Sequence, residues 1–202
     1  MKKLINLFQL KNKTIILVSG LPRSGTSMMM KMLEAGGIPP LTDNIRTADD
    51  DNPKGYYEFE RAKKLREGDT AWLGDAEGKV VKTISALLEH LPADYHYKVI
   101  FMRRAMPEIL ASQRKMLVNR GEDPEKVNDA EMAALFEKHL AKVTRWMAEH
   151  TNFDVLYVNY NDMVENPAPM IPLVNDFLGG KLNTAGMSAV VDPKLYRQRE
   201  ER

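Results

Sequence analysis

Four stretches of the chain are apolar or β-branched at nearly every position. Continuous apolar runs of this kind are typical of strands that a parallel sheet buries on both faces. The pattern therefore predicts four buried strands, over residues 14–19, 79–83, 97–104 and 153–160.

Between and after these strands, apolar residues recur at helical spacing. The pattern predicts helices over residues 27–35, 58–67, 85–90, 107–119, 129–150 and 167–178. In the fifth helix, six apolar side chains share one face and predict packing on the core: Met132, Leu135, Phe136, Leu140, Val143 and Met147. Because strands and helices alternate, we predict an α/β domain with a mainly parallel sheet flanked by helices, and a ligand crevice at the carboxyl ends of the strands.

Length, charge and cysteine content narrow this picture. The chain has 202 residues, and we expect residues 1–202 to form a single domain. Lys and Arg number 29 against 28 Asp and Glu, so the net charge of +1 argues against binding to nucleic acid or to an anionic membrane surface. There is no Cys and no apolar run near about 20 residues long, so we expect a cytoplasmic protein without a membrane span. The sequence does not indicate an oligomeric state.

The turn after the first strand has the layout of a P-loop, in which backbone N–H groups and a helix N-terminus hold an anion. It reads GLPRSGTS, where Gly20 and Gly25 allow a tight turn and a close approach of the backbone to an oxyanion. A nucleotide triphosphatase needs Lys where this chain has Thr26, which is followed by a second hydroxyl on Ser27. The preceding Arg23 supplies a cation instead, and its guanidinium can hold two oxygens of a phosphate or sulfonate.

A second anion site is predicted where the third strand ends. That strand closes with Arg103 and Arg104, at a place where a magnesium-dependent nucleotide enzyme usually has a carboxylate. Pro107 suits a first helical turn, and Ser112 lies on the resulting helix. Arg104 and Ser112 would then receive a second anionic group. Scattered histidines show no metal-ligand spacing, and we predict no metal.

These motifs resemble those of sulfotransferases that use 3′-phosphoadenosine 5′-phosphosulfate (PAPS), in particular bacterial members with a PRSGT loop. GLPRSGTS is similar to their 5′-phosphosulfate loop, and RRAMPEILAS to their 3′-phosphate motif. DNPKGYYE and VLYVNYNDMVENPAPMIPLVNDFLG are also similar to family segments, so the resemblance runs from about residue 15 to residue 179. It implies a P-loop type of three-layer fold and transfer of a sulfonate from PAPS to a hydroxyl or amine acceptor without a metal.

The resemblance also implies roles for individual residues. The 5′-phosphosulfate would be held by Arg23, Ser24, Gly25, Thr26 and Ser27. The 3′-phosphate would be held by Arg104 and Ser112, and Lys82 would stabilise charge on the sulfonate or the bridging oxygen. The basic tail, residues 192–202, either folds over the nucleotide or frays.

One position departs from the family pattern. Many members have Lys-Thr-His after the second strand, with the His as catalytic base, whereas this chain has Ile84 there. Glu58 is our first choice as the replacement base, since some relatives with a PRSGT loop use a Glu from this segment. Its alternative role is that of an acid at a helix N-terminus. His90 is the second choice, and four loop acids cannot be ranked: Asp43, Asp49, Asp50 and Asp51.

Two other functions remain open. A small-molecule kinase of the same fold would need a metal-binding acid, for which Asp162 is the obvious candidate. A binding module that kept the anion loop and lost catalysis would explain Ile84. The acceptor itself is not indicated by the sequence.

Overall fold

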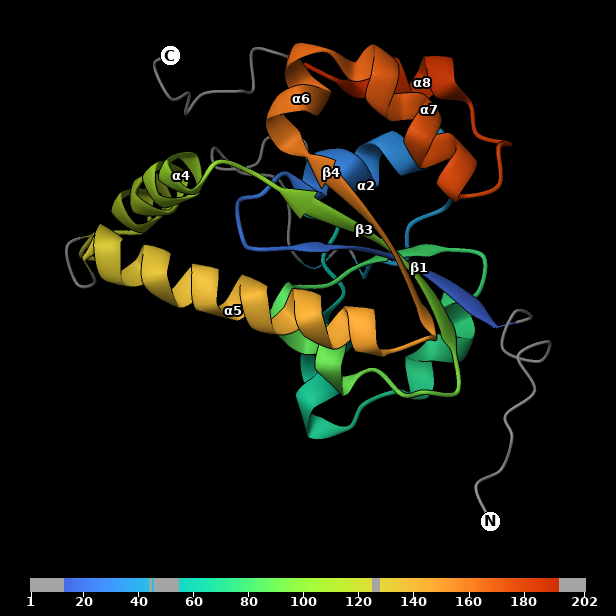
Figure 1. Cartoon of the computed structure of the whole chain (residues 1–202), viewed down its shortest axis with the longest axis horizontal. Coiled ribbons are helices and arrows are strands. Elements are labelled where there is room, and N and C mark those ends of the chain that lie inside the picture. Colours follow the sequence, from blue (N-terminus) through green and yellow to red (C-terminus); the bar gives the residue numbers. More distant parts are fainter. Residues whose placement is uncertain (1–12, 44, 46–54, 125–127, 193–202) are drawn as a thin grey trace.

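The chain forms a three-layer α/β structure in which helices cover both faces of one parallel sheet (Figure 1). The computed structural model describes residues 13–43, 45, 55–124 and 128–192. The four strands are β1 (Thr14–Gly20), β2 (Val80–Lys82), β3 (His96–Arg103) and β4 (Phe153–Asn159), in the order β2-β1-β3-β4. Every pairing is parallel, which confirms the predicted fold class.

The register brings the carboxyl ends of the strands to one edge of the sheet. Val18 pairs with Lys82 in β2, Gly20 pairs with Met102 in β3, and Arg103 pairs with Asn159 in β4. Residues that follow these strand ends are therefore neighbours in space although they are far apart in the sequence. Both predicted anion-binding segments lie at this edge.

One face of the sheet is covered by the helix that follows β1 and by the three helices that follow β4 (Figure 1). They are α2 (Thr26–Ala35), α6 (Tyr160–Glu165), α7 (Pro167–Phe177) and α8 (Thr184–Val190). Met29, Met30 and Leu33 of α2 are fully buried in the core that these helices share with the sheet. β1 contributes Val18 to this core and Leu17 to the opposite one, as expected for a strand buried on both faces.

The other face is covered by the long helix α5 (Asp129–Glu149) and by short helical segments (Figure 1). The short segments are α3 (Glu60–Lys63) and the 3-10 turns η1 (Lys64–Glu67), η2 (Ala71–Ala76) and η3 (Ser85–His90). The sequence predicted one helix over 58–67, but Phe59 is extended and the regular helix begins only at Glu60. The short helices α6 and α8 and the turn η2 were not predicted, because each is too brief to show a periodic pattern.

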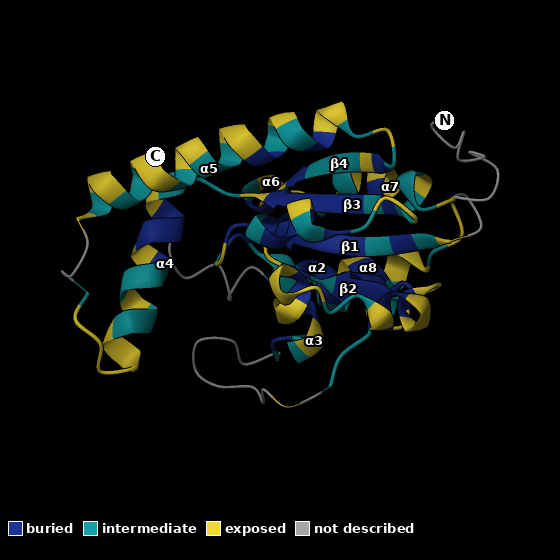
Figure 2. Ribbon diagram, turned by 90° about the horizontal axis from the view of Figure 1, so that it is seen from below, coloured by how far each residue is buried: buried dark blue, intermediate teal, exposed yellow. Residues whose placement is uncertain are grey.

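The helix α5 packs on the core with only part of its predicted apolar face. Val143 and Met147 are buried, whereas Leu135 is 59% exposed. Figure 2 shows the reason: the first half of α5 extends beyond the sheet and lies beside α4 (Met106–Asn119). The prediction that all six apolar side chains face the core was therefore wrong for the N-terminal half of this helix.

A polar contact joins α5 to the segment that follows β2. The side chain of His139 lies 2.8 Å from the hydroxyl of the buried Ser85, measured from Nε2 to Oγ. Burial lowers the pKa of His139 below its usual value of 6.5, although nearby Glu89 acts in the opposite direction. The folded protein thus favours the neutral imidazole.

This shift gives a testable dependence of stability on pH. Because the folded state lowers the pKa of His139, the unfolded chain binds more protons, and His139 costs stability as the pH falls below 6.5. We expect the melting temperature to fall less between about pH 7.5 and about pH 5.5 in His139→Gln than in the native chain. Thermal melts followed by circular dichroism check this, and an equal fall in both proteins would contradict it.

Candidate active site

The loop between β1 and α2 is a tight turn built on left-handed backbone. Gly20, Arg23 and Gly25 all have positive φ angles, of 148°, 69° and 96°. A Cβ at Gly20 would lie 2.6 Å from the Met102 carbonyl oxygen, so only glycine lets β1 end this close to β3. Inside the loop, the buried Ser24 hydroxyl donates a hydrogen bond to the Leu21 carbonyl at 2.7 Å. The loop is therefore held in shape by its own residues.

The start of α2 meets the end of β2 through a lysine. The ammonium of Lys82 donates to the Ser27 hydroxyl at 3.3 Å and to the Tyr56 carbonyl. The Ser27 hydroxyl in turn donates to the same Tyr56 carbonyl at 3.4 Å. Thr26 is the first residue of α2, where backbone N–H groups and the helix dipole favour an anion. A cation and a helix N-terminus thus converge at one place.

The two predicted anion-binding segments touch each other. Arg23 donates from Nε to the Ser112 hydroxyl of α4 at 2.8 Å. Arg104, which directly follows β3, donates from Nη1 to the backbone carbonyl of Arg23 at 3.1 Å. The side chain of Arg104 is only 8% exposed. Both arginines and Ser112 therefore form one continuous site at the carboxyl edge of the sheet.

A family model for the sulfotransferase domain matches residues 13–196 of the chain. The chain belongs to the sulfotransferase family. Its reaction is the transfer of a sulfonate group. Comparison with curated proteins gives no match.

Three solved structures of low sequence identity align with most of this chain. The sulfotransferase domain of the olefin synthase of Synechococcus PCC 7002 has a TM-score of 0.51 at 17% identity, over 93% of this chain and 88% of that one. The sulfotransferase domain from the curacin biosynthetic pathway has a TM-score of 0.49 at 17% identity, over 82% and 73% of the two chains. Retinol dehydratase in complex with androsterone and the inactive cofactor PAP has a TM-score of 0.48 at 18% identity, over 92% and 64%.

Glu58 of this sulfotransferase lies close to the site along the chain, two residues after Tyr56. Its carboxylate is 2.7 Å from the ammonium of Lys63, and its side chain is 14% exposed. The backbone N–H of Glu60, the first residue of α3, donates to the Asp43 carboxylate at 2.6 Å, so a second acid also lies at the start of this helix. Glu58 directly precedes Phe59, the N-cap of α3, so its alternative role as an acid at a helix N-terminus stays a prediction.

The neighbouring Tyr57 is unsuited to act as a base. Its φ of 53° is left-handed, and its hydroxyl donates to the Glu34 carboxylate at 2.5 Å. Burial, together with Glu34, raises the pKa of Tyr57 above its usual value. The phenol therefore stays protonated at neutral pH.

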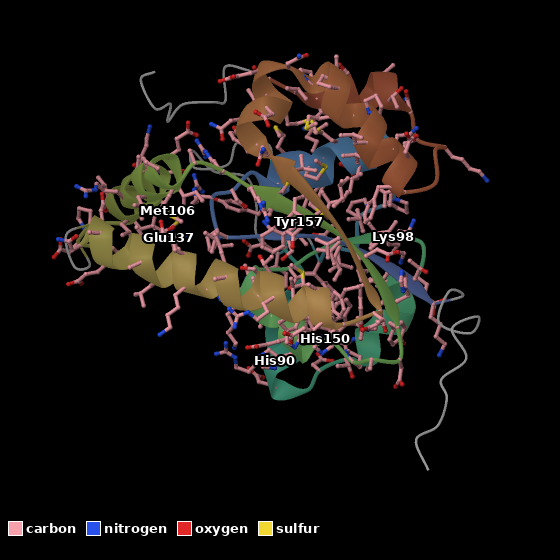
Figure 3. The ribbon with its side chains drawn as sticks, in the orientation of Figure 1. His90, Lys98, Met106, Glu137, His150 and Tyr157 are labelled. Atoms are coloured by element: carbon pink, nitrogen blue, oxygen red, sulfur yellow. The ribbon has the colours of Figure 1, made fainter. Side chains whose placement is uncertain are left out.

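Two of the other candidate bases, His90 and Asp43, lie within the described residues, and the rest do not. Ile84 is 46% exposed at the start of η3, and His90 ends the same turn. Figure 3 shows His90 toward the lower end of the molecule, well away from Met106 in the first turn of α4. Asp49, Asp50 and Asp51 lie outside the described residues, as does the tail from residue 193 onward.

Asp162, the acid that a kinase of this fold would need, is exposed on α6. It accepts a hydrogen bond from Asn159 at 2.9 Å. In the part of the chain that the structure describes, no group of three or more His, Asp or Glu side chains lies close enough together to hold a metal ion. None of the described helices has the length and hydropathy that a membrane crossing needs.

Three residues of the site escaped the sequence analysis. Glu108 lies four residues after Arg104 and pairs with it, a spacing that could have been noticed. Tyr160 and Asn161 directly follow β4, so their position at the carboxyl edge was predictable although their contacts were not. The ring of Tyr160 lies 4.6 Å from the Arg104 guanidinium, measured to the ring centroid.

An open groove of about 900 Å³ lies between α4 and α5. Met106, Pro107 and Leu110 of α4 line one side, and Glu137 of α5 lines the other. Figure 3 shows Met106 and Glu137 close together where α4 and α5 lie beside each other. The groove begins in the first turn of α4, only two residues after Arg104.

The contact between Gly25 and Tyr160 gives a prediction on the loop. A Cβ at Gly25 would overlap the Tyr160 ring, whereas a Cβ at Gly68, with a similar φ of 87°, meets nothing within 4 Å. Both Gly→Ala changes place alanine in left-handed backbone, which costs about 1–2 kcal/mol. We expect Gly25→Ala to lower the free energy of unfolding by about 1–3 kcal/mol beyond that, because the ring must move.

Urea unfolding of the two variants measures the difference directly. Gly68→Ala is the matched control, since it carries the backbone cost without the overlap. Equal losses of stability would show that the Tyr160 ring does not restrain the loop.

Proposed function

We propose that this sulfotransferase takes its sulfonate from PAPS and transfers it to a hydroxyl or amine acceptor. The loop from Arg23 to Ser27 binds the 5′-phosphosulfate, and Arg104 with Ser112 binds the 3′-phosphate. The observation that carries the proposal is the chain of contacts from Arg104 to the Arg23 carbonyl and from the Arg23 guanidinium to Ser112. A nucleotide with two separated anionic groups suits two adjoining cationic receptors.

The proposed reaction makes one sulfur–oxygen or sulfur–nitrogen bond and breaks one sulfur–oxygen bond. The acceptor attacks the sulfur of PAPS and loses a proton. The oxygen that bridged sulfur to the 5′-phosphate leaves with the bonding electrons as part of 3′-phosphoadenosine 5′-phosphate (PAP). Positive charge at Arg23 and Lys82 and the N-terminus of α2 stabilises the charge that develops on the bridging oxygen and the sulfonate.

Glu58 is the proposed base that takes the acceptor proton. Its carboxylate is mostly buried, and Lys63 favours the ionised form that a base requires. The segment that carries it is tied to the site by the bond from Lys82 to the Tyr56 carbonyl. The acceptor itself is proposed to enter by the groove between α4 and α5, which is lined mainly by apolar atoms and therefore suits a largely apolar molecule.

Transfer of radioactive sulfonate from PAPS to a panel of phenols, alcohols and amines tests the proposal. We expect transfer in buffer with a chelator, because the proposed charge stabilisation comes from side chains and backbone. The kinase alternative instead predicts magnesium-dependent phosphate transfer from ATP. The inactive-module alternative predicts tight PAP binding without transfer to any acceptor. No observation on the described residues favours either alternative.

The 3′-phosphate gives the first prediction on affinity. We define the 3′-phosphate increment as the affinity for PAP divided by the affinity for adenosine 5′-phosphate (AMP), both from isothermal titration calorimetry. We expect Arg104→Lys to lower this increment about tenfold, because a lysine keeps the charge that balances Glu108 but lacks the two-pronged guanidinium.

The matched control for Arg104→Lys is the same substitution at the preceding residue, Arg103→Lys. The guanidinium of Arg103 lies over the Tyr157 ring, 3.8 Å from the centroid, and its side chain is exposed. We expect Arg103→Lys to leave the increment within about twofold of the native value. Equal effects of the two substitutions would remove Arg104 from the 3′-phosphate site.

The proposed base gives a second prediction. Glu58 and Glu60 both pair with Lys63, at 2.7 and 2.6 Å, but Glu60 is the more exposed of the two. We expect Glu58→Gln to lower kcat for sulfonate transfer about 100-fold or more, with PAP affinity nearly unchanged, because general base catalysis typically contributes 10²–10⁴-fold.

Glu60→Gln is the control, because it also removes a partner of Lys63. Its kcat should stay close to the native value. Native-like turnover in Glu58→Gln would exclude Glu58 as the base. The proposal that PAPS is the donor would be unaffected.

A further inference from the structure

A buried acid and an amide lie behind Arg104. The Arg104 Nε donates to Oε2 of Glu108 at 2.8 Å. The other carboxylate oxygen of Glu108, Oε1, accepts from the side-chain amide of Asn161 at 2.9 Å. Asn161 lies on α6, 53 residues further along the chain, and its carbonyl oxygen is 3.5 Å from the backbone nitrogen of Ala105. A continuous row of hydrogen bonds thus leads from α6 to the arginine.

The burial of this row makes its hydrogen bonds important. The side chains of Arg104 and Glu108 are only 8% and 3% exposed. A buried carboxylate is stable only when it is paired and its oxygens are hydrogen-bonded. Arg104 satisfies one oxygen of Glu108, and Asn161 satisfies the other. The orientation of the carboxylate is therefore fixed from two sides, by the residue that follows β3 and by a residue of α6.

That orientation decides which part of the guanidinium the acid occupies. Glu108 contacts Arg104 at Nε, whereas Nη1 is directed to the Arg23 carbonyl in the anion loop. A carboxylate that lost its amide partner could turn toward the terminal nitrogens, which can hold two phosphate oxygens. It would then compete with an arriving phosphate.

We propose that Asn161 is a positioning residue for recognition of the 3′-phosphate. The Asn161 amide fixes the orientation of the Glu108 carboxylate. Glu108 in turn binds Arg104 at Nε and keeps the guanidinium turned toward the ligand. The inference rests on the proposed function, since it assumes a nucleotide with a 3′-phosphate. Asn161 need not touch that nucleotide, and its effect passes through Glu108 and Arg104.

The test compares two asparagines of the same junction. Asn161→Ala removes the amide that binds Glu108. Asn159→Ala is the matched control, because the Asn159 amide binds only the exposed Asp162 among the contacts described. We expect Asn161→Ala to lower the 3′-phosphate increment about tenfold, the size expected for a lost hydrogen bond to a charged group, with AMP affinity within about twofold. Asn159→Ala should leave both affinities unchanged.

Each outcome separates this inference from the proposed function. If the native protein binds PAP no better than AMP, the proposed donor fails and the inference fails with it. If the native protein shows the increment and Asn161→Ala retains it, only the inference is overturned. A parallel loss of PAP and AMP affinity would indicate a general disturbance of the site and would also overturn it. Should Asn161→Ala fail to fold, Asn161→Ser gives the same comparison, because serine is polar but too short to reach Glu108.

Discussion

The parallel pairing of β1 with β3 is the constraint on which the site depends. Because the two strands run side by side to Gly20 and Met102, the segments that follow them must leave the sheet at the same place. Gly20 makes this approach close, since any side chain there would meet the Met102 carbonyl. Arg104 then lies within hydrogen-bonding distance of the loop backbone. The geometry of the proposed anion site is thus set by the sheet.

The site concentrates positive charge in a protein whose net charge is only +1. Arg23, Lys82 and Arg104 all lie at the carboxyl edge, and the buried acid Glu108 pairs with Arg104. A buried guanidinium without an anion would be costly, so Glu108 stabilises the unliganded protein. The same acid weakens the attraction of Arg104 for a ligand, unless it is confined to one edge of the guanidinium. The position of the carboxylate therefore matters as much as its charge.

The sequence predicted those features that depend on local pattern. All four strands, the tight turn after β1 and the position of Arg104 at a strand end were predictable, because a buried strand and the turn after it occupy consecutive residues. The contacts of Lys82 with Tyr56 and of Glu108 with Asn161 join residues 26 and 53 positions apart, so they depend on the tertiary arrangement. The prediction that Leu135 packs on the core was wrong for a related reason. Helical spacing shows which side chains share a face, but not where the sheet beneath that face ends.

Because this chain has Ile84 where many family members have histidine, the catalytic base of the proposed reaction must come from another segment. A histidine at this position would stand at the end of β2, close to Lys82, whereas Ile84 is half-exposed and cannot accept a proton. Glu58 approaches from a different segment, which Lys82 and Ser27 tie down through the Tyr56 carbonyl. Lys63 pairs with the Glu58 carboxylate and would compete with the acceptor hydroxyl of the proposed reaction for its oxygens. An acceptor that displaces Lys63 as it binds would obtain the base only when correctly placed, which would couple acceptor recognition to proton removal.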